Sequence, residues 1–64
     1  MMFRGKFNYQ GEIITLNTEE ALTKSQALRF FCRGIALKKG LKERFIRSYF
    51  NGIKNNFEIM EVKP

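Results

Sequence analysis

The sequence contains no histidine and no aspartate, and Cys32 is its only cysteine. The lack of histidine excludes Cys–His and Ser–His nucleophilic catalysis and, with a single cysteine, the ordinary zinc sites. The lack of aspartate excludes the metal-binding loops that are rich in this residue. A single cysteine allows no intrachain disulfide, which fits a reducing cytoplasm. Its apolar surroundings predict that Cys32 is a small core residue.

Other features of enzymes and of membrane proteins are also missing. The six glutamates show no paired spacing in a shared apolar setting, and there is no glycine-rich phosphate loop. No apolar run reaches the length of a membrane span, and the N-terminal residues include no signal-peptide apolar region. We therefore expect a cytoplasmic protein that is not an enzyme, has no cofactor or metal, takes no small-molecule substrate and does not enter a membrane.

Acidic residues are scarce in the middle of the chain, and this concentrates the net charge of +6 there. The segment Arg29–Lys54 has eight Lys or Arg and one acid, whereas the other residues include four Lys or Arg and five acids. A localised positive charge suits contact with a nucleic-acid backbone or another anionic surface. The alternative is a solvated helical face that only aids solubility.

The length of 64 residues predicts one small α+β domain, residues 1–64. The 44% hydrophobic content, with seven phenylalanines, is rich enough for folding. A chain this short nevertheless has a marginal core, because it buries a modest fraction of its surface. A homodimer, or docking on a larger protein partner, would add stability.

The first part of the sequence predicts a β-hairpin over Met1–Asn17. Small or apolar residues alternate with polar ones at Phe3, Gly5, Phe7 and Tyr9. The turn is expected at Asn8–Gly11, with its glycine at positive φ. In the second arm, Ile14 and Leu16 should face the core with the phenylalanines, and Ile13 the opposite side of the sheet.

A first helix is expected to start between residues 18 and 24, at one of two capping signals, and to end at Lys39 before Gly40. If it starts late, the second strand should extend past Asn17. Its apolar stripe consists of Ala27, Leu28, Phe31, Cys32, Ile35 and Ala36, widened by Phe30, Gly34 and Leu37. Glycine inside a helix costs about 1 kcal/mol relative to alanine, which predicts close packing of another element over Gly34.

A second helix is expected over Leu41–Asn51, closed by Asn51-Gly52, and a last strand over Phe57–Val62, ended by Pro64. The apolar face of this helix would comprise Leu41, Phe45, Ile46, Tyr49 and Phe50. The resulting β-β-α-α-β order predicts an α+β fold, with a small three-stranded antiparallel sheet and both helices on one face. The last strand should pair beside the first arm of the hairpin.

Residues 32–51 resemble the helix-turn-helix of bacterial DNA-binding proteins. With Cys32 counted as the first of the motif's residues, Ala36 falls on the small fifth position, Gly40 on the ninth, and Ile46 on the β-branched fifteenth. A small residue lets the second helix approach, glycine makes the turn, and isoleucine locks the two helices together. The usually apolar tenth and eighteenth positions hold Leu41 and Tyr49. The usually apolar eighth holds Lys39, whose amine must extend to the surface.

The resemblance implies that the second helix is the recognition helix of a DNA-binding protein. Arg44 and Arg47 could then read guanine edges and Asn51 adenine. Lys38, Lys39 and Lys54 would contact phosphates, which set affinity and register. The candidate nucleic-acid-binding residues are Lys38, Lys39, Lys42, Arg44, Arg47, Ser48, Asn51 and Lys54.

The leading hypothesis from the sequence is a small basic accessory or regulatory protein that binds nucleic acid, with DNA favoured over RNA. A phage or other mobile element would be a fitting source for such a chain. In a second hypothesis, the helices simply cover the sheet and their basic face docks on an acidic protein. In a third, aromatic residues of the first strand stack on RNA bases beside Arg4 and Lys6. The competing explanation for Phe3 and Phe7 is that they form the sheet's side of the core.

Overall fold

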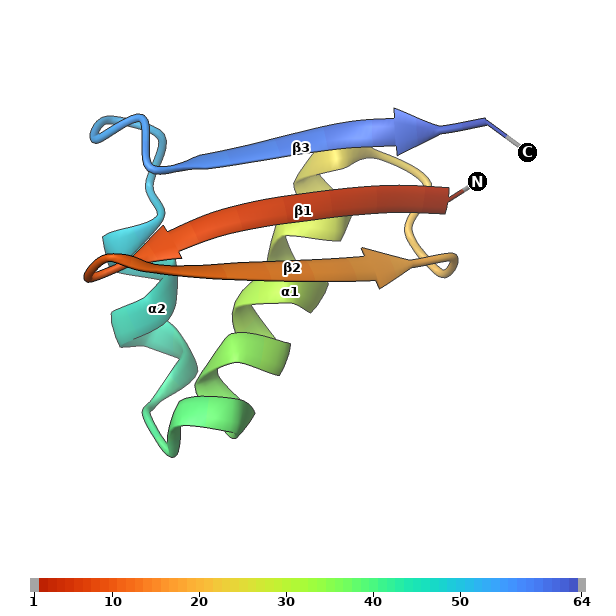
Figure 1. Cartoon of the computed structure of the whole chain (residues 1–64). Helices are drawn as coiled ribbons and strands as arrows, with labels where there is room; N and C mark the ends of the chain where they lie inside the picture. The colour runs from red at the N-terminus through yellow and green to blue at the C-terminus, as the bar shows by residue number, and fades with distance from the viewer. Residues whose placement is uncertain (1, 64) are drawn as a thin grey trace.

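The computed structural model describes residues 2–63, which form a three-stranded sheet and two helices. In chain order the elements are β1 (Met2–Tyr9), β2 (Glu12–Thr18), α1 (Lys24–Lys39), α2 (Glu43–Tyr49) and β3 (Phe57–Val62). The sheet is antiparallel in the order β2-β1-β3, and both helices cover one of its faces (Figure 1). This confirms the predicted α+β fold and the pairing of the last strand with the first. Met1 of the predicted hairpin and the predicted stop at Pro64 lie outside the described residues.

The turn between β1 and β2 consists of two residues, both in the left-handed region. Gln10 has φ 52° and Gly11 has φ 90°, between the paired residues Tyr9 and Glu12. Two positive φ values are typical of the type I′ turn, whose twist matches that of the strands. The backbone N–H of Gly11 donates to Asn8 Oδ1 at 2.9 Å. The predicted turn glycine is confirmed, and Gln10 shares its conformation.

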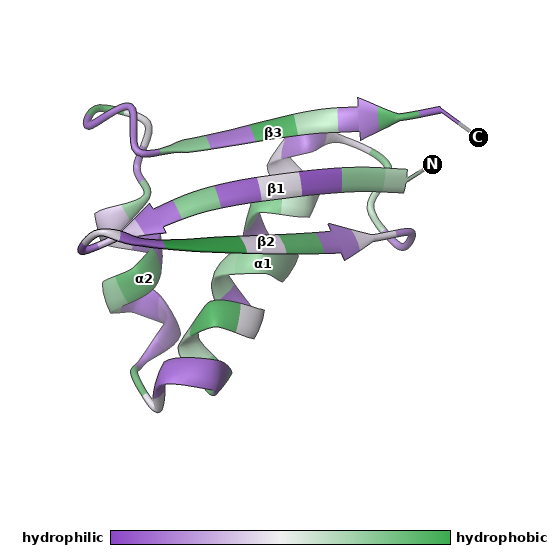
Figure 2. Cartoon of the chain, viewed as in Figure 1, coloured by the Kyte–Doolittle hydropathy of each residue, from purple (hydrophilic) through white to green (hydrophobic). Residues whose placement is uncertain are grey.

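Alternate residues of the hairpin face opposite sides of the sheet, as their pattern predicts. Phe3, Phe7 and Ile14 are buried beneath the helices, whereas Ile13 is 53% exposed on the open face. Arg4 also lies exposed on that face, as do Lys6 and Thr15. Figure 2 shows the resulting alternation of hydrophilic and hydrophobic residues along β1.

Phe7 is the centre of the core and joins every layer of the fold. Its ring meets Phe31 of α1 edge-on at 5.7 Å between centroids and Phe50 at 4.9 Å. It also stacks on Phe57 of β3 at 5.5 Å. The side chain has no exposed surface. Aromatic contacts of this geometry add to the stabilisation from burial, so Phe7 links the sheet to both helical segments.

The first helix begins at the later of the two predicted capping signals. Thr23 is the N-cap, and its hydroxyl accepts from the N–H of Gln26 at 3.2 Å. β2 accordingly extends to Thr18, past Asn17, as a late start predicts. The buried residues of α1 are Ala27, Phe31, Cys32, Ile35 and Ala36, all from the predicted stripe.

Two of the residues that were expected to widen the apolar stripe of α1 are not buried. Leu37 is 79% exposed and Phe30 is 36% exposed, because they lie on a side of α1 that neither the sheet nor α2 covers. Gly34 is not closely packed either, since a Cβ added there would meet only Leu16 Cδ1, at 3.9 Å. That distance is ordinary van der Waals contact, so nothing in the protomer explains this glycine by close packing.

α1 ends as predicted, at Lys39, with Gly40 in the left-handed conformation at φ 68°. The N–H of Leu41 bonds to the carbonyl of Ala36 at 2.9 Å, and the N–H of Gly40 to that of Leu37 at 3.4 Å. These two bonds form a Schellman motif. Leu41 therefore belongs to the cap of α1.

α2 is shorter at both ends than the predicted range Leu41–Asn51. Leu41 caps α1 and Lys42 is extended, so the helix starts only at Glu43. At the other end Phe50 leaves helical geometry, with ψ 61°, where its ring packs against Phe7. Asn51 consequently lies in the loop that leads to β3. Asn55, shortly before β3, has a positive φ of 51°.

The predicted apolar face of α2 is also too wide. Ile46 and Phe50 are buried and Tyr49 is half-buried, whereas Leu41 is 42% and Phe45 59% exposed. The short helix lies at the hairpin end of the molecule beside α1 (Figure 1), so it has only one covered side.

Candidate nucleic-acid interface

The side of α2 that faces away from the core carries polar and basic residues. Ile46 of α2 is 1% exposed and Ala36 of α1 is 4% exposed, so the two helices meet closely where the small residue permits it. Helical periodicity then directs Arg44 and Ser48, four residues apart, to the opposite side. Both are exposed, as is Arg47. Arg44 and Ser48 therefore stand clear of the rest of the domain, whereas Arg47 lies on the side toward α1, where it lines a groove with residues of that helix.

The structure exposes most of the predicted binding residues. Those that are exposed are Lys38, Lys42, Arg44, Arg47, Ser48, Asn51 and Lys54. They come from the end of α1, the turn, α2 and the loop after it. The hydrophilic colour at the C-terminal turn of α1 gives way to pale and hydrophobic colours in the connection and returns at the start of α2 (Figure 2). One polar surface is thus built from consecutive segments.

Lys39 is the exception, because its side chain is held against the hairpin. Its amine donates to the carboxylate of Glu12, and it lies 6.0 Å from the centroid of the Tyr9 ring. Its side chain is 25% exposed, which fits a lysine at a usually apolar position of the motif. The hydrogen bond from Lys39 and its positive charge lower the pKa of Glu12. Lys39 thus already has an anionic partner.

Asn51 and Lys54 are placed by the loop between α2 and β3. The Oδ1 atom of Asn51 accepts from the N–H of Ile53 at 2.9 Å, which is local turn bonding. The amine of Lys54 lies 4.7 Å from the centroid of the Tyr49 ring, close enough for a cation–π contact. Asn51 therefore sits beside the end of the helix, and Lys54 is directed to the hairpin end of the molecule.

Most basic residues of the central segment have no acidic partner. Arg33 pairs with Glu43 at 3.2 Å, which neutralises the only acid of that segment and joins α1 to the start of α2. Within residues 2–63, the only other ion pair is that of Lys39 and Glu12. The basic residues of the segment that remain without an acidic partner there are Arg29, Lys38, Lys42, Arg44, Arg47 and Lys54.

A groove between α1, α2 and β3 adds one residue to the predicted set. The groove has a volume of about 360 Å³, and Arg29 and Arg47 both line it. From the sequence, Arg29 counts only as one of the central charges, because nothing local shows that it would line a groove with Arg47. Cys32 also lines the groove, and burial raises the pKa of its thiol to about 11, although the nearby Arg47 opposes this. The cysteine is therefore a neutral, unreactive part of the core.

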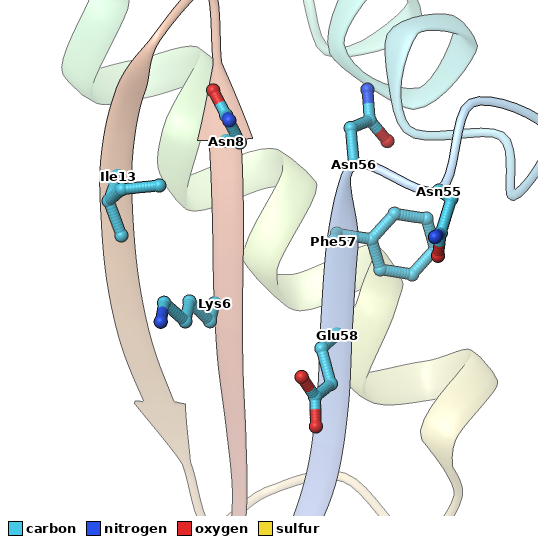
Figure 3. A pocket seen from close by; sticks show the side chains of 7 residues that line it. All are labelled: Lys6, Asn8, Ile13, Asn55, Asn56, Phe57 and Glu58. Carbon is cyan, nitrogen blue, oxygen red and sulfur yellow. The ribbon is translucent and has the colours of Figure 1, made fainter.

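The open face of the sheet offers much less charge. A shallow hollow of about 420 Å³ lies there, and Figure 3 shows Lys6 and Glu58 on adjacent strands beside it. Arg4 and Lys6 share this face with the carboxylate of Glu58, and a net charge of about +1 gives little attraction for a polyanion. Phe3 and Phe7 point to the core and are 3% and 0% exposed, so neither can stack on a base. The core explanation for these two phenylalanines is the right one.

Comparison with known proteins finds no match to this chain among family models, curated proteins or solved structures. The helix-turn-helix resemblance therefore stays a prediction. No helix within residues 2–63 has the length and apolar character needed to cross a membrane. In the same residues, His, Cys, Asp and Glu side chains form no group of three that could hold a metal ion.

Proposed function

We propose that this protein binds nucleic acid, DNA rather than RNA, through the exposed face of α2 and the basic residues beside it. The observation that carries the proposal is the set of unpaired Lys and Arg side chains on the helical side of the molecule. Such a surface attracts the phosphate backbone and releases its counterions. The protein would act as an accessory or regulatory factor without a cofactor.

The dimensions of α2 are compatible with entry into a major groove. An α-helix with its side chains is about 10–12 Å across, and the groove is about 12 Å wide. The seven residues of α2, at about 1.5 Å each, would extend about 10 Å within it. Arg44 and Arg47 would lie nearest to the base edges. Lys38 and Lys42, at the turn, would contact phosphates on one side, with Lys54 at the other end of the helix.

A salt titration tests the proposal. Binding to duplex DNA and to single-stranded RNA is measured by fluorescence anisotropy between about 50 and 200 mM salt. For about four neutralised phosphates, the logarithm of the DNA binding constant should fall with the logarithm of salt at a slope of about −3.6. Absence of duplex binding at the lowest salt would exclude this function and favour an acidic protein as the partner.

Two arginine variants and a control locate the surface. Arg44→Ala and Arg47→Ala should each weaken duplex binding several-fold, and should reduce preference between sequences if these residues read bases. Lys6→Ala removes the same charge from the open sheet face and should change binding little. A loss in Lys6→Ala equal to that in the arginine variants would contradict binding through α2 and favour the sheet.

A further inference from the structure

The outer edge of β2 is a row of unpaired backbone groups. Within residues 2–63, no strand pairs with that side, because the sheet order is β2-β1-β3. The N–H of Asn8 bonds to Asn56 on the β3 side, so Asn8 and its partner Ile13 do not bond to each other. By alternation, the N–H groups of Ile13, Thr15 and Asn17 point away from β1.

β2 lacks three of the features that commonly protect a sheet edge, namely lysine, proline and a bulge. Its seven residues, EIITLNT, include no lysine and no proline, and each pairs in turn with a residue of β1 without a bulge. Proteins commonly protect exposed edges with such features, because a long flat edge otherwise pairs with another strand. This edge is suited to accept a strand.

Exposed apolar side chains of α1 lie below the same edge. A Cβ added at Gly34 would meet Leu16 of β2 at 3.9 Å, so Gly34 lies beside this strand. Phe30 and Leu37 are four residues before and three after Gly34, which places them on the same side of the helix. Leu37 is 79% exposed, and the C-terminal half of α1 extends past the β2 edge in Figure 1. The free edge and the apolar stripe thus form one continuous flank.

A glycine at position 34 is explained better by contact with a second helix than by any contact within the chain. Nothing within the chain packs closely on it, although glycine weakens a helix. Between Phe30 and Leu37, the missing side chain would let a second helix approach the backbone of α1. A helix from a second copy, brought in by pairing of the strands, would lie there.

The charges at the two ends of this flank are opposite. Glu19 and Glu20, between β2 and α1, are exposed at one end, and Lys38 is exposed at the other. A two-fold axis perpendicular to the sheet would pair β2 antiparallel with its copy and set the two α1 helices antiparallel. The acidic end of each copy would then approach the basic end of the other.

We propose that two copies of this chain form a symmetric dimer through β2 and the Phe30–Gly34–Leu37 side of α1. The sheet becomes continuous across the two copies. Cys32, which lines the groove against Arg47 of α2, is two residues from Gly34 and so on the opposite side of α1. The basic face of α2 therefore stays free, and the dimer does not depend on the proposed function.

Sedimentation equilibrium with two variants and a control tests the dimer. At high concentration the mass should be twice the 7.6 kDa of the chain. Thr15→Pro removes an outward N–H without touching the β1–β2 bonds, and Leu37→Glu places charge in the stripe. Each should raise the dissociation constant at least about tenfold, because it removes contacts made only in the dimer. The control is Ile53→Glu, in the α2–β3 loop, where Ile53 is 84% exposed. It should leave the dissociation constant of the dimer unchanged.

Amide exchange followed by NMR provides a second readout. The amides of Ile13, Thr15 and Asn17 should be protected at high concentration and lose protection on dilution. A monomer mass at all concentrations, or a dimer that keeps its affinity in Leu37→Glu, would overturn the proposal. The Leu37→Glu result decides the matter even if Thr15→Pro fails to fold, because Leu37 makes little contact within the protomer.

Discussion

Gly5 is the residue at which the core leaves no room for a side chain. A Cβ added there would lie 2.5 Å from Phe7 Cε1 and 2.7 Å from Phe31 Cδ2. Both rings are buried, so neither can move aside. In the sequence Gly5 only continues the alternation of β1. The structure shows that it lets the Phe31 ring of α1 lie directly on the strand.

We expect Gly5→Ala to destabilise the protein by about 2 kcal/mol, the range for overpacking a tight core. Urea unfolding, followed by circular dichroism at concentrations that keep the chain monomeric, measures the change. Gly34→Ala is the matched control: the nearest atom is 3.9 Å away, and helix propensity predicts a gain of about 1 kcal/mol. Equal effects of the two substitutions would contradict this account of Gly5.

At the scale of elements, the fold depends on how α1 ends. The Schellman motif at Gly40 turns the chain toward α2, and the last residue of α1, Lys39, reaches back to Glu12 at the start of β2. The ion pair of Arg33 and Glu43 holds the start of α2 against α1. These contacts connect α1 to α2, which follows it in the chain, and to the start of β2, 27 residues before Lys39.

Lys39→Met should raise the pKa of Glu12 toward 4.5, because the hydrogen bond and the charge of Lys39 are what lower it. A lowered carboxyl pKa stabilises the fold above pH 4.5, and this stabilisation is lost as the pH falls through the folded-state value. An NMR titration of the Glu12 carboxyl carbon measures the shift. Lys38→Met removes a smaller electrostatic contribution and should raise the pKa less. An unchanged Glu12 pKa in Lys39→Met would contradict the contact.

At the scale of the whole molecule, one aromatic cluster closes the fold. Phe7, Phe31, Phe50 and Phe57 come from different segments and meet in one place. Replacing Phe7 with alanine would cost about 3–5 kcal/mol, comparable to the total stability of a domain this small. Unfolding should therefore involve the sheet and both helices together.

The Cys32 thiol reports on this cooperative opening. It has no exposed surface, and burial raises its pKa to about 11, so at pH 8 about one molecule in a thousand carries the thiolate. We expect slow reaction with an aromatic disulfide reagent in buffer and fast reaction in denaturing urea. Above the ordinary value of 9.0 the thiol ionises more readily in the unfolded chain, so stability should fall as pH rises. Rapid, complete labelling of the native protein would contradict a buried Cys32.

Features that depend on near neighbours in the sequence were predictable. The alternation in β1 and the glycine at Gly40 rest on local backbone and side-chain preferences, which also offered Thr23 as one of two candidate caps. The bounds of α2 were not predictable in this way. Leu41 is drawn into the cap of α1, and Phe50 leaves the helix to pack on Phe7.

The candidate site shows the same division. The concentration of Lys and Arg in the central segment can be read directly from the sequence, and so can their placement on two helices and the connection between them. The partners of these residues cannot, because an ion pair depends on distances across the fold. Only the structure pairs Lys39 with Glu12 and brings Arg29 beside Arg47.

The sequence by itself determined the order of strands and helices. It also determined which segments have one polar and one apolar face, and which region carries the charge. These follow from periodicity, which acts over a few residues. Tertiary structure decided how far the covered part of each apolar face extends. Phe31 is buried, as its place in the stripe predicts, whereas Phe30 and Leu37 are exposed. The physical reason is that one sheet face and one short helix can cover only part of α1.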